Sequence, residues 1–489
     1  MKLELKGHNF RYECEKICRI FFPAEKIIFA ENGEEVPDDG RNVYTEIEKD
    51  GENYRFSCKA VIDGKENAYS FVSDLSADDA DEEKELAKAI VKVLSEITGI
   101  TPPWGILTGV RPTKLMRTYI SLFGDEKAQK LFENELLVSR EKTALAYKVA
   151  KIEERAVSLS KEKSFSLYVS IPFCPTRCSY CSFVSHSIAQ AKKLIPDYVS
   201  LLCKEIKETA KVAKELNLTL ETVYIGGGTP TSLEHTDLEK ICNALKENFD
   251  MASVREFTVE AGRPDTITEE KLRVLKQAGV TRISINPQSF SDEVLKNIGR
   301  KHTAEDIYNK FSLARSSGFD NINTDLIAGL SGDSVDGFSL SVDKAIALGA
   351  ENITVHTLAL KSASDLVTNR QTDKLSLDTE KMVKYANKAL SEAGYIPYYM
   401  YRQSKSLGNL ENVGWCKENY DCLYNIYMME EIHSVFAVGA GAVTRLKNQQ
   451  TGKISRVYNF KYPYEYISRF DELITRKKDI LEFYGGTDG

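Results

Sequence analysis

The chain has no run of about 18 consecutive apolar residues, which is the length that a helix needs to cross a membrane. Its N-terminus, MKLELKGHNFRYECEKICRIFF, alternates charged and apolar side chains and lacks the unbroken apolar stretch of a secretory signal. Low-complexity segments and repeats of fixed period are missing too, which argues against a repeat architecture. We therefore expect a cytoplasmic protein without a membrane span.

An excess of positive charge is also missing, because 65 Lys and Arg stand against 72 Asp and Glu, for a net charge of -7. We therefore expect no nucleic acid as a partner, although a local basic pocket is compatible with this charge. The 10 cysteines in 489 residues are too sparse for a disulfide scaffold, and a cytosolic chain keeps its thiols reduced. Cysteines that cluster in such a chain indicate metal binding or catalysis.

With 42% hydrophobic residues the chain can build a large core, and its patterns divide it into three parts. Residues 1–160 show strand patterns followed by helical ones, which predicts an N-terminal α+β domain. Residues 165–365 are the most regular part. Residues 366–489 mix helical and strand patterns and are expected to form a C-terminal extension.

The middle part alternates strand and helix patterns six times. The expected strands are Leu167–Ile171, Thr222–Ile225, Glu256–Glu260, Arg282–Asn286, Asn321–Ile327 and Ile353–Leu358. Helical patterns cover roughly 195–216, 235–248, 269–278, 291–298, 304–317 and 336–348. Repeated βα units with near-continuous apolar strands predict an α/β fold with a parallel sheet covered by helices. Six units are two short of a closed (β/α)8 barrel, so we favour an open three-quarter (β/α)6 barrel over a doubly wound sheet.

Three cysteines, Cys174, Cys178 and Cys181, lie within eight residues just after the first of these strands. Their thiolates can converge only if the loop curls around a ligand, and cysteine thiolates are the usual ligands of iron–sulfur clusters. Three ligands would leave one iron of a [4Fe-4S] cluster open to a cofactor or substrate. A structural zinc site is less favoured because no second cysteine pair stands at matching spacing, and inert thiols are the other alternative.

Chemistry in parallel α/β barrels takes place at the carboxyl ends of the strands. The second strand ends in a glycine run with Gly227 and Gly228, followed by Thr229, and glycines let the backbone approach a ligand closely. The third strand ends in Glu260, whose carboxylate needs a partner if it is buried. The later strand ends supply further candidates, which are Asn286, Gln288, Arg300, Asp325, His356 and Ala359. Each could be structural by itself, but together they predict a ligand site at this end of the sheet.

The spacing Cys-x3-Cys-x2-Cys, with Tyr180 before the last cysteine, resembles the radical S-adenosylmethionine (SAM) superfamily. Over roughly residues 165–360 the sequence is also similar to the oxygen-independent coproporphyrinogen III oxidases, or dehydrogenases, in three motifs: YVSIPFC from Tyr168, GGGTPT, and DLIAGL from Asp325. The segments WGILTGVRPTK and YYMYRQ resemble the longer HemZ-type branch of that family.

The resemblance implies a [4Fe-4S] cluster on the three cysteines and two SAM molecules beside it. Tyr168 would join the cysteines in the catalytic set. The residues implied for the SAM on the cluster are Tyr168, Tyr180, Gly227, Glu260 and Ala359. Those implied for a second SAM are Gly228, Thr229, Gln288, Arg300 and Asp325.

The activity implied by the resemblance is radical chemistry on a tetrapyrrole. An electron from the reduced cluster would cleave SAM, and the resulting radical would take hydrogen from a propionate of coproporphyrinogen III. Loss of CO2 and one electron leaves a vinyl group, and two rounds give protoporphyrinogen IX in haem biosynthesis. A flavodoxin or ferredoxin would supply the electrons. Arg402 and Arg445 are candidates for holding the substrate carboxylates.

Two positions depart from the family pattern. Ser170 stands where much of the family has a histidine, and Phe183 stands where well-studied members have a fourth cysteine. The related HemW-type haem chaperones also have an aromatic residue at the latter position. A haem chaperone that binds haem and a [4Fe-4S] cluster is therefore one alternative, and another radical SAM enzyme acting on a tetrapyrrole is a second.

Overall fold

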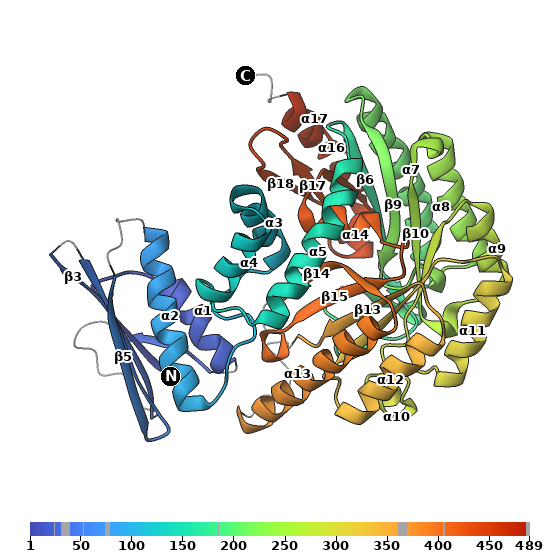
Figure 1. Cartoon of the computed structure of the whole chain (residues 1–489). Helices are drawn as coiled ribbons and strands as arrows, with labels where there is room; N and C mark the ends of the chain where they lie inside the picture. The colour runs from blue at the N-terminus through green and yellow to red at the C-terminus, as the bar shows by residue number, and fades with distance from the viewer. Residues whose placement is uncertain are drawn as a thin grey trace. The chain divides into compact units, whose positions relative to one another are not determined.

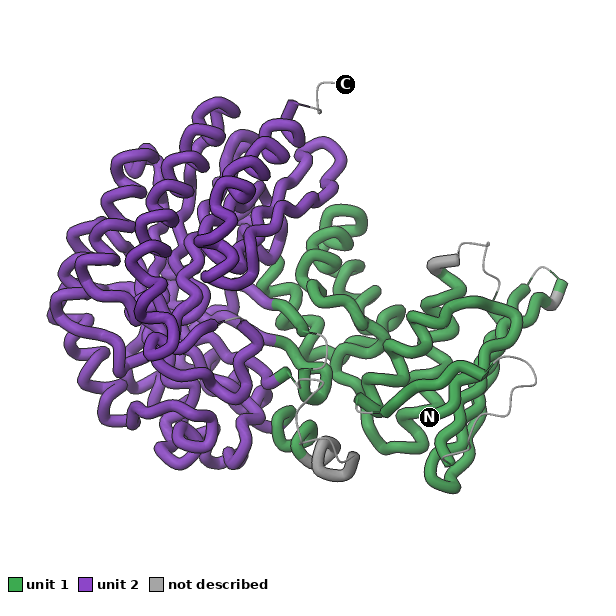
Figure 2. The backbone as a smooth tube through the Cα atoms, turned by 180° about the vertical axis from the view of Figure 1, so that it is seen from behind, with its two compact units in different colours: residues 1–150, 359–380, 401–411 green, residues 151–358, 381–400, 412–489 purple. Residues whose placement is uncertain are grey.

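The computed structural model describes residues 1–23, 25–30, 40–51, 53–73, 79–183, 185–359, 369–403 and 406–485. The chain forms two compact units (Figure 2). The first contains residues 1–150, 359–380 and 401–411, and the second contains residues 151–358, 381–400 and 412–489. Within the described parts of the chain, no helix is both long and apolar enough to traverse a lipid bilayer.

The first unit begins with a five-stranded sheet in the order β2-β1-β3-β4-β5. Its strands are β1 (Lys2–Lys6), β2 (Ile28–Ala30), β3 (Arg41–Asp50), β4 (Asn53–Ile62) and β5 (Lys65–Ser73). The helices α1 (Arg11–Phe21) and α2 (Asp79–Thr98) pack against each other, and α2 also packs on β4 and β5 (Figure 1). Alternate residues of β4 are buried, as expected for a strand with one face on a core. The N-terminal region is therefore an α+β structure.

Three further helices complete the N-terminal part of the chain: α3 (Pro112–Phe123), α4 (Asp125–Asn134) and α5 (Arg140–Leu159). Within the first unit, the carboxylate of Glu411 is fully buried and ion-paired with Lys142 Nζ at 2.6 Å. It also accepts a hydrogen bond of 2.8 Å from the indole of Trp104. These two partners satisfy the buried charge and tie a late segment of the chain to the early helices.

The second unit contains the six expected parallel strands and the helices between them. Its parallel strands are β6 (Ser164–Ile171), β9 (Thr219–Gly227), β10 (Glu256–Gly262), β11 (Arg282–Ile285), β12 (Ile322–Ala328) and β13 (Asn352–Thr357). Their helices are α7 (Ile195–Glu215), α8 (His235–Asn248), α9 (Glu269–Gln277), α10 (Asp292–Asn297), α11 (Ala304–Ser316) and α12 (Val335–Ala347). The six strands are neighbours in chain order, whereas a doubly wound sheet reverses its order at a switch point. The helices lie along the outside of the strands (Figure 1), so the open (β/α)6 barrel is confirmed.

Strands from the C-terminal part extend this sheet to 11 strands. On one side β16 (Ser434–Val438) pairs in parallel with β6, followed by β17 (Val443–Lys447) and β18 (Ile454–Tyr458). On the other side β15 (Glu411–Cys416) is antiparallel to β13, with β14 (Ile396–Arg402) beyond it. The remaining helices are α13 (Asn369–Glu392), α14 (Leu423–Glu430), α15 (Pro463–Ser468), α16 (Phe470–Thr475) and α17 (Lys478–Gly485).

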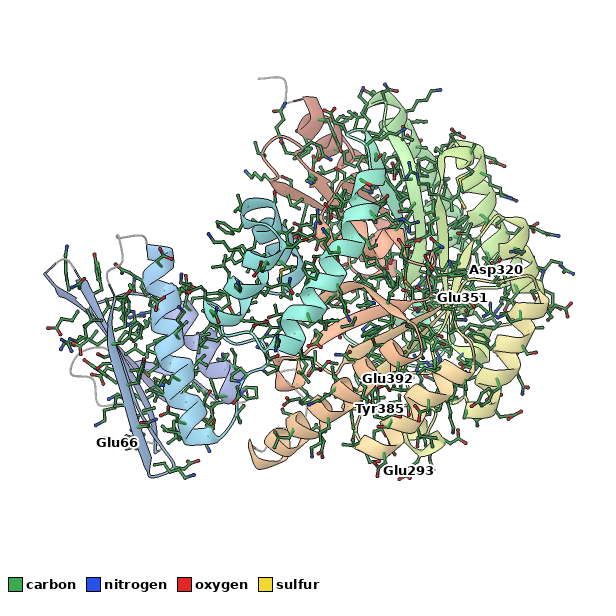
Figure 3. All side chains as sticks on the ribbon, in the orientation of Figure 1. Glu66, Glu293, Asp320, Glu351, Tyr385 and Glu392 are labelled. Atoms are coloured by element: carbon green, nitrogen blue, oxygen red, sulfur yellow. The ribbon has the colours of Figure 1, made fainter. Side chains whose placement is uncertain are left out.

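Glu351 forms ion pairs at the amino end of the barrel. Asp320 and Glu351, labelled in Figure 3, lie just before β12 and β13. Both carboxylate oxygens of Glu351 accept from Arg315 Nη2 at 2.8 Å, and Lys417 Nζ lies 3.4 Å from one of them. This end therefore serves stability, and the ligand candidates lie at the opposite, carboxyl end of the strands.

Candidate active site

The cysteine loop begins where β6 ends. The short strands β7 (Phe173–Cys174) and β8 (His186–Ser187) pair with each other and frame the loop. Cys178 is buried, and Cys174 and Cys181 are half-buried. Among the described residues, no three His, Cys, Asp or Glu side chains are gathered as a ready site for a single metal ion. A cube-shaped cluster binds its ligands at separate corners, so it requires thiolates that are further apart than those around one ion.

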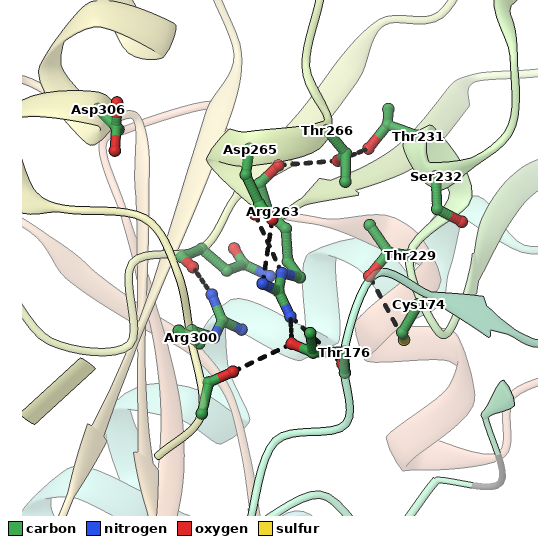
Figure 4. Close-up of polar contacts among 12 residues, drawn as sticks. Cys174, Thr176, Thr229, Thr231, Ser232, Arg263, Asp265, Thr266, Arg300 and Asp306 are labelled. Carbon is green, nitrogen blue, oxygen red and sulfur yellow. Dashed lines mark hydrogen bonds and ion pairs between the residues drawn. The ribbon is translucent and has the colours of Figure 1, made fainter. Parts of the chain in front are cut away.

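Two neighbouring segments hold the cysteine loop between Cys174 and Cys178 (Figure 4). Arg263, just past β10, donates from Nη1 to Thr176 Oγ1 at 2.7 Å and to Thr176 O at 3.2 Å. Thr176 Oγ1 in turn donates to Gly299 O at 3.0 Å. The amide of Ser179 donates to Ile298 O at 3.2 Å, so the loop is fixed to backbone on both sides of Cys178.

Tyr180 and Arg300 lie together behind Cys178. Arg300 donates from Nη2 to the hydroxyl of Tyr180 at 3.1 Å and from Nη1 to the carbonyl of Asn286. The Tyr180 ring packs against a buried apolar cluster made of Val294, Leu295, Ile298, Ile327 and Leu330. Burial acts to lower the pKa of Arg300, but the adjacent Tyr180 and Cys178 outweigh it and raise that pKa. A buried guanidinium that stays charged therefore stands directly beside a predicted cluster ligand.

The glycine run after β9 lies against the cysteine loop. Gly228 donates to Ile171 O at 2.8 Å, and a Cβ atom on Gly228 would lie 2.9 Å from the sulfur of Cys174. Gly227 has φ +112°, a conformation that side chains other than glycine rarely adopt. The hydroxyl of Thr229 lies 3.5 Å from Cys174 Sγ. The run thus forms a glycine cradle whose backbone lies directly against the cysteine loop, where a side chain on Gly228 would collide with Phe173 and Cys174.

Glu260, at the end of β10, faces a stack of three tyrosines. Tyr224 donates to Glu260 Oε1 at 2.7 Å, and its ring stacks on Tyr424 at 4.5 Å and on Tyr168 at 6.1 Å. Burial and the nearby charge of Asp325 raise the pKa of Glu260 to about 7, against the Tyr224 hydrogen bond, which lowers it. The charge of Arg282 also lowers this pKa, but no ion pair with Glu260 is found among the described residues, so the ammonium group of a ligand would be a direct partner for this carboxylate.

Asp325 lies in β12, and Gln288 follows β11 and bridges to Leu326 of β12. Asp325 accepts a hydrogen bond of 2.7 Å from Asn323 Nδ2, and His356 Nε2 lies 3.7 Å from its other carboxylate oxygen. Burial acts to raise the pKa of Asp325, but His356 and Asn323 lower it, so the carboxylate stays charged. Gln288 is buried with φ +68°, and its side-chain oxygen finds no hydrogen-bond partner among the described residues. Strained backbone and an unsatisfied polar atom are features that a bound ligand would explain.

Two of the predicted residues fall in the first unit, not in the unit that carries the barrel. Ala359 belongs to the first unit, where it forms an isolated bridge with Ser406, so its SAM contact stays a prediction. Arg402 also belongs to the first unit and is buried, with Nη1 donating to Leu107 O at 2.6 Å. Burial raises the pKa of Tyr424, and the positive charge of Arg445 lowers it. This effect indicates that Arg445 lies near the tyrosine stack.

Three residues of the site were not among the sequence candidates: Arg263, Tyr224 and Tyr424. Arg263 stands three residues past Glu260, so the rule of polar residues after strand ends could have found it. Tyr224 lies inside β9 and reads as an ordinary strand aromatic. Tyr424 comes from α14, far along the chain, and no local pattern connects it with the barrel.

The residues present fit a [4Fe-4S] cluster with SAM. The donor set is the three cysteines of one loop, which suits a cluster that leaves one iron open. Glu260 and the side-chain oxygen of Gln288 offer polar groups without full partners at the same end of the strands. These features are expected around the methionine and ribose parts of SAM.

Comparison with known proteins agrees with this site. The Radical SAM superfamily model matches residues 168–345. The chain is 40% identical over 414 residues to the oxygen-independent coproporphyrinogen-III oxidase-like protein HemZ of Bacillus subtilis, covering 82% of this chain and 83% of that protein. The chain belongs to the HemZ family of radical SAM proteins. Membership of this superfamily implies a [4Fe-4S] cluster and SAM as cofactors.

The chain is also similar to two other kinds of protein, the haem chaperones HemW and the coproporphyrinogen III oxidase HemN. The haem chaperone HemW of Bacillus subtilis is 36% identical over 217 residues, which cover 44% of this chain and 56% of HemW. The solved coproporphyrinogen III oxidase HemN from Escherichia coli, a radical SAM enzyme, aligns with a TM-score of 0.50 at 23% identity, over 66% of this chain and 72% of HemN. At that identity the likeness to HemN shows the shared fold.

Proposed function

We propose that the protein is a radical SAM oxidoreductase that converts the propionates of coproporphyrinogen III to vinyl groups, giving protoporphyrinogen IX. The observation that carries the proposal is the joint placement of the cysteine loop, the glycine cradle and Glu260 at one end of a HemZ-family barrel. HemZ carries the name of a coproporphyrinogen-III oxidase-like protein, and HemN, which shares the fold, is a coproporphyrinogen III oxidase.

In this proposal Cys174, Cys178 and Cys181 hold three irons of the cluster. Glu260 would bind the SAM ammonium, helped by backbone at Gly227, with Tyr168 and Tyr180 beside them. When bound, the reduced cluster and SAM supply a radical that abstracts hydrogen from the substrate. The chain's own residues then orient both ligands and exclude water, because the stacked rings of Tyr168, Tyr224 and Tyr424 lie beside Glu260.

A second SAM would lie on Gly228, Thr229, Gln288, Arg300 and Asp325. Asp325 stays charged and suits a ligand cation or hydroxyl, while Arg300 suits a carboxylate. Arg445, near Tyr424, would hold a substrate carboxylate. A flavodoxin or ferredoxin as reductant and a cytoplasmic location stay predictions from the sequence.

The second candidate function is haem binding as a chaperone. It is favoured by the similarity to HemW and by Phe183, which is 61% exposed where a fourth cysteine would otherwise stand. Against it, the match to HemZ is both longer and more identical than the matches to HemW.

One anaerobic experiment separates the two functions. The chain is loaded with iron and sulfide, reduced with dithionite and given SAM with coproporphyrinogen III, and the products are identified by mass. We expect protoporphyrinogen IX and 5′-deoxyadenosine. The Cys178→Ala variant should lose both products and the cluster absorbance, while Cys242→Ala, which removes a buried thiol of α8, should keep them. Haem is added to a parallel sample of the loaded chain. Tight binding of this haem without vinyl products would favour the chaperone and contradict the proposal.

A further inference from the structure

The cysteine loop has almost no regular structure of its own. Residues 175–183 form neither helix nor strand, so the path of the backbone between the cysteines depends on contacts with other elements. Such a segment loses much conformational freedom when it closes around a ligand. A residue that fixes the loop in advance lowers this cost and favours ligand binding.

Arg263 has the geometry of such a residue (Figure 4). It is 3% exposed, and its Nε and Nη2 donate to the two carboxylate oxygens of Asp265 at 3.0 and 3.1 Å. This bidentate pair fixes the plane of the guanidinium. The remaining nitrogen, Nη1, then points at Thr176 and donates to both its hydroxyl and its carbonyl oxygen.

The backbone before Arg263 explains why the side chain can reach the loop. The pairing of β10 with β11 shifts register between Glu260 and Gly262, as at a β-bulge. Gly262 has φ +53°, and the amide of Arg263 donates back to Ala261 O at 2.6 Å in a tight turn. Bulges of this kind re-aim side chains next to active sites. Glu260 therefore faces the tyrosine stack, while Arg263 faces the cysteine loop.

We propose that Arg263 is a positioning residue that holds the segment from Cys174 to Cys178 in its cluster-binding form before a cluster is present. Because the same strand end carries Glu260, Arg263 also links the place of the cluster to the place of the SAM ammonium group. The inference rests on the proposed role of the three cysteines as cluster ligands and of Glu260 as a SAM ligand.

Hydrogen exchange of the cluster-free chain tests this hold directly. Two loop amides are hydrogen-bonded and report its opening: Ser179 N to Ile298 O and Cys181 N to Cys178 O, both at 3.2 Å. In Arg263→Gln we expect these amides to exchange about tenfold faster than in the wild type. Thr176→Val, which removes the hydroxyl acceptor and keeps the side-chain volume, should give a smaller increase of about threefold. Thr176→Ser should behave as the wild type.

A matched control is Arg315→Gln, which removes another arginine paired with a carboxylate in the same unit. It should leave exchange at Ser179 and Cys181 unchanged. Unchanged exchange at these amides in both Arg263→Gln and Thr176→Val would overturn the proposal. If Arg263→Gln fails to fold, Thr176→Val and Thr176→Ser alone decide the outcome.

Cluster loading provides the second readout. After anaerobic reconstitution, iron and sulfide per chain should fall at least twofold in Arg263→Gln. The change that SAM makes in the electron paramagnetic resonance signal of the reduced cluster should also weaken. Full loading with an unaltered response to SAM would overturn the proposal even if the loop exchanges faster. A wild-type chain that loads its cluster but makes no vinyl product would instead refute the proposed reaction and leave the exchange result standing.

Discussion

Tyr224 donates a hydrogen bond of 2.7 Å to Glu260, and this bond joins a stack of three tyrosines to the carboxylate at the end of β10. The bond lowers the pKa of Glu260, which burial holds near 7. Because an ammonium group binds the ionised carboxylate, the hydrogen bond favours the form of Glu260 that can hold SAM at neutral pH.

We therefore expect Tyr224→Phe to weaken SAM binding most strongly around pH 7. Loss of the hydroxyl raises the pKa of Glu260 further, so a smaller fraction is ionised at this pH. The dissociation constant for SAM should rise about three- to tenfold at pH 7, corresponding to about 0.7–1.4 kcal/mol, and less at pH 9. Equilibrium dialysis over this pH range measures the effect. Tyr427→Phe, which removes a similar bond to Glu221, is the control and should leave the pH profile unchanged.

The raised pKa of Glu260 also affects the stability of the ligand-free chain. The folded state holds this proton up to about pH 7, whereas the unfolded chain releases it near its ordinary value of 4.5. The stabilisation is therefore fully present below pH 4.5 and is lost as the pH rises through 7. Above pH 7, Glu260→Gln should be more stable than the wild type by about 1–3 kcal/mol, because each tenfold change in a proton-binding constant corresponds to about 1.4 kcal/mol.

Urea unfolding of the ligand-free chain at pH 5 and pH 8 checks this prediction. Glu293→Gln, which changes an exposed carboxylate, serves as the control and should follow the wild type at both pH values. An equal loss of stability from pH 5 to pH 8 in the wild type and in Glu260→Gln would contradict a raised pKa of Glu260 in the folded chain. The same Glu260→Gln variant should bind SAM more weakly, so stability and ligand binding change in opposite directions.

Much of this barrel could be predicted from the sequence because its signals are local. Each expected strand, such as Leu167–Ile171 within β6, is an apolar run followed by an amphipathic helix. The cysteine loop and Glu260 could be located by their positions at strand ends, and the structure places them together. Their roles as ligands follow from chemistry and stay predictions until they are measured.

Other features depend on pairings between distant parts of the chain, which no local pattern encodes. The parallel pairing of β16 with β6 joins residues more than 250 positions apart, such as Phe436 and Leu167. Tyr424 reaches the tyrosine stack because Glu256 accepts hydrogen bonds from the first amides of α14, at Leu423 and Tyr424. Arg263 depends on a β-bulge, which becomes visible only when strand register is known.

Arg300 should tune the reduction potential of the cluster. Its buried guanidinium lies beside Cys178 and favours the more negative, reduced form of a bound cluster. Arg300→Gln should therefore lower the midpoint potential, by tens of millivolts as an order of magnitude, whereas Arg300→Lys keeps the charge and should stay closer to the wild type. A redox titration followed by electron paramagnetic resonance measures this shift. An unchanged potential in Arg300→Gln would mean that the guanidinium does not act on the cluster.

Arg445 and Arg402 should respond differently to substitution. Arg445 lies near the tyrosine stack, so Arg445→Met should raise the KM for coproporphyrinogen III about tenfold, with little change in thermal stability. Arg402 is buried and donates to the carbonyls of Leu107, Gly109 and Asn409. Arg402→Met should therefore lower stability by about 2–4 kcal/mol without a selective effect on KM. Steady-state kinetics with thermal unfolding distinguishes these outcomes, and the reverse pattern would contradict both assignments.

In the proposed function, this barrel couples SAM cleavage to hydrogen removal from a coproporphyrinogen propionate. The most direct measurement uses coproporphyrinogen III deuterated at the propionate carbon beside the ring, with the cluster-loaded chain, dithionite and SAM under anaerobic conditions. If the proposed reaction takes place, deuterium should appear in the 5′-deoxyadenosine product, in step with formation of vinyl groups. Unlabelled 5′-deoxyadenosine together with intact coproporphyrinogen III would contradict it.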